Sequence, residues 1–116
     1  MREFLKELND ATGTSGSMVI TPDGIMVAAA FTADLEEDVV AAFASSLLVS
    51  LKRSLAKVNA QGQLAWCTLK ASEGAMMFVN MENSYLVIIA DPKAELNPSD
   101  PPVQDAIHKI KNRRVA

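Results

Sequence analysis

Cysteine, histidine and aromatic residues are scarce in this chain. Its 116 residues include one cysteine, one histidine and one tryptophan, and aromatic residues make up 5% of the sequence. The lone Cys67 cannot form an internal disulfide, and its place in an apolar strand pattern predicts an inert, buried thiol. No Cys/His cluster has the spacing of a metal site, no glycine-rich phosphate loop occurs, and His108 is not expected near Cys67. The sequence therefore predicts a non-enzymatic protein that binds no metal and no cofactor.

Positive charge and long apolar runs are also scarce. Eleven basic residues stand against 14 acidic ones, giving a formal net charge of -3 and a pI near 5.0, which argues against nucleic acid as the main partner. No stretch approaches the roughly 20 apolar residues of a membrane span, and residues 1–11 contain carboxylates where a signal peptide would be apolar. We therefore expect a cytoplasmic protein with no membrane insertion. The length predicts a single domain over residues 1–116.

The longest helical pattern covers residues 35–59. Asp34 is the expected N-cap, with Glu37 in capping-box position, and Asn59 and Gly62 are the expected stop signals. At 3.6 residues per turn one side of this helix is an apolar stripe, which predicts that it lies on a sheet. The residues of this stripe are Val40, Phe43, Ala44, Leu47, Leu51, Leu55 and Val58.

The opposite side of the same helix is unusual because it has small residues where a solvated helix would display lysine and glutamate. Small side chains let another backbone approach, so a self-complementary contact about a two-fold axis would explain this surface. A helix buried within one subunit, or an exposed face of solvated serines and helix-favouring alanines, would explain it too. The residues concerned are Ala41, Ala42, Ser45, Ser46, Val49 and Ala56.

The remaining patterns place the other elements. Residues 2–9 predict a short amphipathic helix, and residues 17–21 and 25–31 a hairpin around Pro22-Asp23-Gly24. Short turns predict that residues 64–70, 75–81 and 85–90 form an antiparallel meander, and Asp100 is the expected cap of a final helix. Consecutive apolar positions in the last two strands predict that both faces of the sheet are covered. The expected class is α+β, a three-layer α-β-α sandwich on a five-stranded antiparallel sheet, in the order helix-β-β-helix-β-β-β-helix.

Two features allow alternative interpretations. Trp66 could anchor an interface or pack under the long helix. The basic residues at the C-terminus could complement the helix dipole or contact an acidic partner. They are Lys109, Lys111, Arg113 and Arg114.

The order and lengths of these elements resemble the Roadblock/dynein light chain family. The similarity lies in the hairpin of residues 16–25, the long helix and residues 85–90. It implies a roadblock/profilin-like fold and a homodimer in which the long helix and the strand of residues 64–70 pair with their copies in a continuous sheet. The interface residues are then Ala42, Ser45, Ser46, Val49, Arg53, Leu64, Trp66 and Thr68.

This resemblance also implies a function. Family members are non-enzymatic adaptors for small Ras-like GTPases, such as the MglB-like gliding-motility regulators of bacteria, and some stimulate GTP hydrolysis without an arginine finger. Arg53 is therefore given no catalytic role. A relay or scaffold subunit that associates with a sensor histidine kinase or a motor complex, without activating a GTPase, is the alternative. The candidate partner-binding residues are Lys52, Lys57, Lys109, Arg113 and Arg114.

Overall fold

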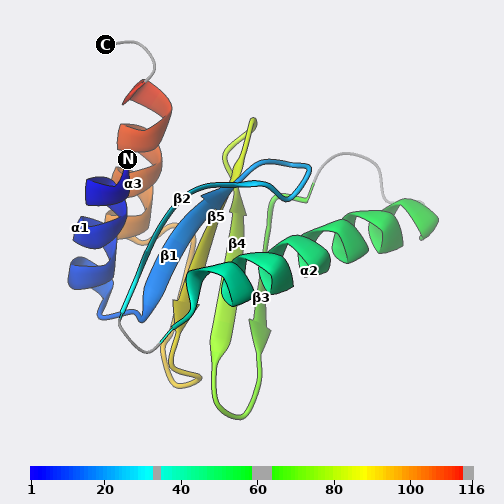
Figure 1. Cartoon of the computed structure of the whole chain (residues 1–116), viewed down its shortest axis with the longest axis horizontal. Helices are drawn as coiled ribbons and strands as arrows, with labels where there is room; N and C mark the ends of the chain where they lie inside the picture. The colour runs from blue at the N-terminus through cyan, green and yellow to red at the C-terminus, as the bar shows by residue number, and fades with distance from the viewer. Residues whose placement is uncertain (33–34, 59–63, 114–116) are drawn as a thin grey trace.

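The expected order of helices and strands is confirmed. The computed structural model of the chain describes residues 1–32, 35–58 and 64–113, and within them three helices surround a five-stranded antiparallel sheet of order β2-β1-β5-β4-β3 (Figure 1). The elements are α1 (Arg2–Thr12), β1 (Gly16–Ile20), β2 (Met26–Phe31), α2 (Glu37–Lys57), β3 (Trp66–Lys70), β4 (Ala75–Asn80), β5 (Tyr85–Ala90) and α3 (Pro101–Asn112).

The β1–β2 hairpin forms where proline and glycine permit a tight turn. Gly24 has φ 90°, which favours glycine, and its N–H donates to the Thr21 carbonyl oxygen at 2.8 Å. The register shifts between Val19 and Ile20, so that Val19 faces Ala28 and Ile20 faces Met26. This bulge leaves Val27 without a directly opposed residue.

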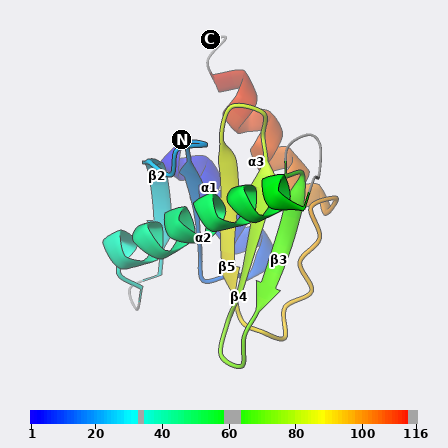
Figure 2. The ribbon, with the colours of Figure 1, turned by 90° about the vertical axis from the view of Figure 1, so that its right-hand side faces the viewer.

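Side chains on the two faces of the sheet form separate cores because successive residues of a strand point to opposite sides. On β5, Leu86 and Ile88 belong to the core under α1 and α3, whereas Tyr85 and Val87 belong to the core under α2. Figure 2 shows the sheet between these two helical layers. The consecutive apolar residues of β4 and β5 are thereby explained, and the three-layer α-β-α sandwich is confirmed.

Helix α1 is longer than expected. It continues to Thr12, and Gly13, with φ 67°, ends it in a left-handed cap. The Asn9 side-chain amide donates to the Ala30 carbonyl oxygen at 2.9 Å, and the buried Ser17 hydroxyl donates to the Asn9 side-chain oxygen at 2.8 Å. These bonds tie α1 to the sheet, which explains why a polar segment can remain helical.

The predicted buried stripe of α2 is partly wrong. Only Ala44 and Leu48 are buried, whereas Phe43 is 57% and Val58 72% exposed. The sheet-facing line runs through residues four apart, and Phe43 lies about 100° around the helix from Ala44. A helix that is apolar on most sides offers several lines of similar hydrophobicity, so periodicity alone could not select between them.

The expected ends of α2 differ as well. The helix begins at Glu37 with Glu36 as N-cap, and no side-chain capping hydrogen bond is present there. Asp34, Asn59 and Gly62 lie outside the described residues, so their proposed capping roles are not tested.

Helix α2 also contradicts the expectation that no segment is long and apolar enough to cross a membrane. Its 21 residues meet that criterion by length and composition, with a mean hydropathy of 1.5 over 18 residues, of which 11% are buried within the subunit. A helix that packs on a sheet and presents a second apolar face meets the same criterion. In this fold α2 crosses one face of the sheet from β2 to β3 (Figure 2), and its C-terminal half diverges from that face (Figure 1).

Candidate partner-binding surface

The exposed side of α2 carries apolar side chains at helical spacing. Val39 is 60% and Phe43 57% exposed. Val39 lies on the side of α2 opposite the buried Leu48, and Phe43 lies on its flank. Exposed apolar side chains in a continuous row are typical of protein interaction sites. We call this row the outer α2 face, and it consists of Val39, Ala42, Phe43, Ser46, Val49 and Arg53.

An apolar hollow lies beside this row, on the same side of the sheet. It has a volume of about 300 Å³, and Phe43 and Leu47 of α2 form one wall. Leu69, Met76 and Ile89, from three neighbouring strands, form its floor. We call it the α2 hollow. Because one side of Phe43 lines the hollow and the rest faces solvent, the outer α2 face and the hollow make one continuous apolar surface.

Strand β3 forms one edge of the sheet and has a single neighbouring strand among the described residues. Its register places Trp66 opposite Val79 and Leu69 opposite Met76. Val79 belongs to the core under α1 and α3, so Trp66 lies on the side of β3 away from α2, where it is half exposed. Trp66 therefore does not pack under the long helix.

Two other predicted interface residues, Thr68 on β3 and Leu64 just before it, have different surroundings. The Thr68 hydroxyl is buried and has no hydrogen-bond partner within the described chain, which is unfavourable unless a further contact supplies one. Leu64 is half-buried against the core under α2, and its carbonyl oxygen accepts a hydrogen bond from the Asn80 side chain at 2.9 Å.

Ser45 does not lie on the exposed face with Ser46. Its hydroxyl donates to the Gly24 carbonyl oxygen of the β1–β2 hairpin. A side chain at Gly24 would place its Cβ 2.9 Å from the Ser45 Cβ, so helix and hairpin are in close contact. Ser45 thus serves a contact within the subunit, and Ala42, Ser46, Val49 and Arg53 are the predicted interface residues of α2 that remain exposed.

The predicted partner-binding cations fall into two groups on opposite sides of the sheet. Lys52 and Lys57 are exposed on the C-terminal half of α2, beside Arg53. The Lys52 ammonium donates to the Pro22 carbonyl oxygen at 3.3 Å. Lys109 lies on α3 instead, so the basic residues do not converge on one patch.

Lys109 is engaged within the subunit. Its ammonium lies 2.8 Å from the Glu7 carboxylate and 3.0 Å from that of Asp105, and these hydrogen bonds raise the pKa of Lys109. The pair with Glu7 joins α3 to α1. Arg113 follows α3 at its C-terminal cap, and Arg114 lies outside the described residues.

Cys67 is half-buried, and burial raises the pKa of its thiol. The raised pKa lowers the thiolate fraction, which agrees with the predicted low reactivity. Among the residues that the structure describes, no group of three or more His, Cys, Asp or Glu side chains is placed to hold a metal ion.

The site consists of exposed contact surface, and comparison with known proteins shows to which family the chain belongs. A model of the Roadblock/LC7 domain matches residues 2–90. The chain belongs to the Roadblock/LC7 family. A relative from Methanocaldococcus jannaschii, MJ1340, is 29% identical over 107 residues, which are 92% of this chain and 93% of that protein.

Solved structures agree with this family fold. The Roadblock/LC7 domain from Streptomyces avermitilis has a TM-score of 0.80 at 12% identity and covers 100% of this chain and 98% of its own. The gliding protein MglB from Thermus thermophilus has a TM-score of 0.76 at 18% identity, and the match covers 98% of this chain and 88% of the MglB chain. Profilin II from Acanthamoeba castellanii has a TM-score of 0.59 at 13% identity and covers 97% and 98%, so the fold is roadblock/profilin-like.

The residues that sequence analysis missed are Val39, Phe43 and Leu69. Phe43 was assigned to the core, and Val39 and Leu69 were given no role. The signal was present in the composition of α2, since a helix that is apolar around most of its circumference predicts contacts on more than one side.

Proposed function

We propose that two copies of this Roadblock/LC7 chain form a homodimer through the outer α2 face and β3, and that the dimer is a non-enzymatic adaptor for a small Ras-like GTPase. The observation that supports the dimer most strongly is the continuous apolar surface of the outer α2 face and the α2 hollow. Water contact with so much apolar surface is unfavourable, and burial against a second copy would remove it.

The shape of the subunit suits a two-fold arrangement. Toward its C-terminus helix α2 diverges from the face of its own sheet (Figure 1) and ends in front of β3 (Figure 2), so its C-terminal half stands clear of the sheet of its own subunit. A two-fold axis beside β3 would place this half over the α2 hollow of the other copy and would pair the two β3 strands antiparallel. Pairing would also protect the free β3 edge and its exposed Trp66 and Leu69.

The interface in this proposal includes both predicted and newly found residues. Small side chains at Ala42 and Ser46 permit close approach of the two α2 helices, and Phe43 and Val49 supply apolar contact. Thr68 and Leu64 lie at or beside the paired edge. Ser45 stays with its own hairpin.

The dimer can be tested with a matched pair of serine substitutions. Ser46→Arg would bury an unpaired charge at the contact and should weaken association by several kcal/mol. Ser99→Arg introduces the same side chain at an exposed position in the loop before α3 and should have no effect. Light scattering at decreasing protein concentration measures the difference. A Ser46→Arg variant that remains dimeric would exclude this interface.

The GTPase role rests on family membership and on the structural similarity to MglB. Lys52, Arg53 and Lys57, exposed on the C-terminal half of α2, would contact an acidic surface of the partner. A further MglB structure is described as a tetrameric arrangement, so the light-scattering experiment should also be examined for assemblies larger than a dimer.

The adaptor role is tested by affinity capture from native lysate with a non-hydrolysable GTP analogue or GDP, followed by mass spectrometry. We expect a small GTPase to be enriched with the analogue and lost with Lys57→Glu. Lys93→Glu, an exposed position outside α2, should retain it. Equal capture with GDP would reject nucleotide sensing, and capture of a sensor histidine kinase in its place would favour the relay function.

A further inference from the structure

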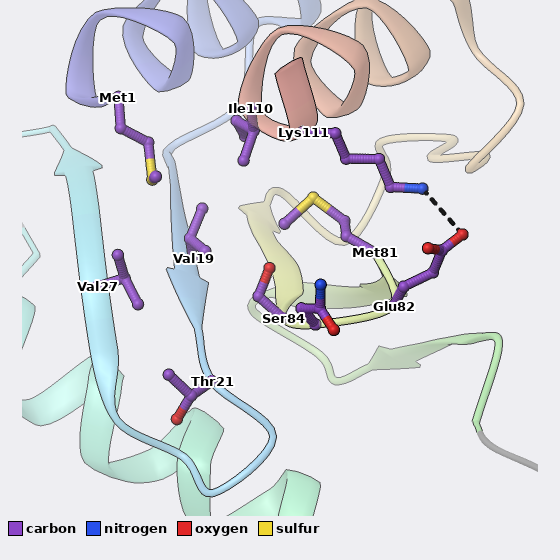
Figure 3. A pocket seen from close by; sticks show the side chains of 10 residues that line it. Met1, Val19, Thr21, Val27, Met81, Glu82, Ser84, Ile110 and Lys111 are labelled. Carbon is purple, nitrogen blue, oxygen red and sulfur yellow. Dashed lines mark hydrogen bonds and ion pairs between the residues drawn. The ribbon is translucent and has the colours of Figure 1, made fainter. Parts of the chain in front are cut away.

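A second recess lies on the other side of the sheet, under α1 and α3. It has a volume of about 220 Å³. It opens between Met1, which is the N-cap of α1, the last turn of α3, the β1–β2 hairpin and the β4–β5 turn. Figure 3 shows the side chains that line it. We call it the α1–α3 recess. It is separated from the outer α2 face by the whole thickness of the sheet.

The floor of the recess is aliphatic. Val19, Met81 and Ile110 are each at most 5% exposed, and Val27, at the β-bulge, forms an open wall that is 48% exposed. Met1 closes the upper side (Figure 3). Such a surface would bind a short aliphatic group.

The rim of the recess consists mainly of hydrogen-bond donors. The Ser84 hydroxyl is directed toward the same space as Val19 and Met81 (Figure 3), and Asn83 also lines the recess. Neither side chain has a hydrogen-bond partner among the described residues. Lys111 supplies the cation, and its ammonium lies 3.4 Å from the Glu82 carboxylate.

The Lys111–Glu82 pair can exchange partners. The side chain of Glu82 is 82% exposed and that of Lys111 41%, and an exposed ion pair contributes little free energy. A ligand carboxylate at the rim could therefore take the place of Glu82, because it would also accept hydrogen bonds from Ser84 and Asn83.

We propose that the α1–α3 recess binds a short aliphatic monocarboxylate, with its chain on Val19, Val27 and Met81 and its carboxylate at Lys111, Ser84 and Asn83. Size sets the ligand class. An engineered cavity of about 150 Å³ accepts benzene, so a recess of this volume has room for about nine non-hydrogen atoms. This proposal does not rest on the GTPase adaptor role, and either can fail without the other.

The test is an NMR titration of the full chain with 4-methylpentanoate, followed by backbone amide shifts. We expect saturable shifts centred on Val27, Ser84 and Lys111, with a dissociation constant on the order of 1 mM. Acetate lacks the aliphatic chain and 4-methylpentan-1-ol lacks the charge, so both should bind at least about fivefold more weakly. Absence of saturable shifts at these residues, or equal binding of the alcohol, overturns the proposal.

Substitutions locate the site. Val27→Glu places a like charge in the recess and should remove measurable binding, whereas Ile25→Glu, an exposed position nearby that does not line the recess, should bind normally. Lys111→Gln lies on the exposed last turn of α3, so the fold should tolerate it, and binding should weaken about tenfold. Unchanged binding by Lys111→Gln would overturn the proposed carboxylate position even if Val27→Glu failed to fold.

Discussion

Phe43 provides the sharpest test of the α2 surface. An aromatic side chain of this kind exposes roughly 200 Å² when free, and Phe43 is 57% exposed in the subunit. About 110 Å² of apolar area is thus available for burial by a second copy. At about 25 cal/mol per Å², this area corresponds to about 3 kcal/mol for each Phe43.

The effect of Phe43→Ala is doubled by symmetry. A two-fold interface contains the residue twice, so the variant should lose about 4–6 kcal/mol of association free energy, which raises the dimer dissociation constant about 1000-fold or more. The fold of the subunit should change little, because more than half of the side chain is already in water. Sedimentation velocity over a range of concentrations measures the dimer dissociation constant, and thermal unfolding at low concentration measures the stability of the isolated subunit.

Val27→Ala is the matched control. Val27 is also about half exposed, at 48%, but lies on the opposite side of the sheet, so its removal should leave association unchanged. If the Phe43→Ala variant and the parent chain have the same dimer dissociation constant, the proposed interface is refuted. A parent chain that stays monomeric at every concentration would refute the homodimer itself.

Further predictions concern the packing of α2 and the single thiol. Leu48→Ala removes a fully buried side chain and should lower the free energy of unfolding in urea by about 2–5 kcal/mol, whereas a loss below 1 kcal/mol would mean that α2 is not anchored there. Gly24→Ala must adopt φ 90° with its Cβ 2.9 Å from the Ser45 Cβ and should cost about 1–3 kcal/mol in the same assay. Burial raises the pKa of Cys67 above its ordinary 9.0, so the thiol ionises at a lower pH in the unfolded chain than in the folded chain. The contribution of the neutral thiol to stability is therefore complete below pH 9 and should be lost as the pH rises through the folded-state pKa. Cys67→Ala should remove that pH dependence, and iodoacetamide should react more slowly with folded Cys67 than with the urea-unfolded chain at the same pH.

Local signals were sufficient for most of the architecture. Pro22-Asp23-Gly24 predicted the first hairpin, and Asp100 before two prolines predicted the start of α3, because turn and cap residues act over a few positions of the chain. Apolar residues at consecutive positions of β4 and β5 predicted helices on both faces of the sheet. Each of these elements was found where the pattern placed it.

The surfaces required the tertiary structure. The composition of α2 showed a helix with too much apolar surface for one contact, but it could not show that Leu48 is buried against the sheet while Phe43 remains 57% exposed on the flank of the helix. Several lines along such a helix are similarly hydrophobic, and the hairpin decides between them by contacting Ser45. Likewise, Lys52 and Lys109 are both basic residues on helices, and only the fold separates them onto opposite layers.

Both proposed sites illustrate the same division between sequence and structure. The sequence by itself determined the element order, the three layers and the lack of clustered catalytic residue types, since these follow from periodicity, turn chemistry and composition. Tertiary structure alone decided that Phe43 lines a hollow with Leu69 and Met76, and that Lys111 meets Glu82 beside Val27. Those neighbours come from elements far apart in the chain, and their contacts depend on sheet order and helix rotation, which no local pattern encodes.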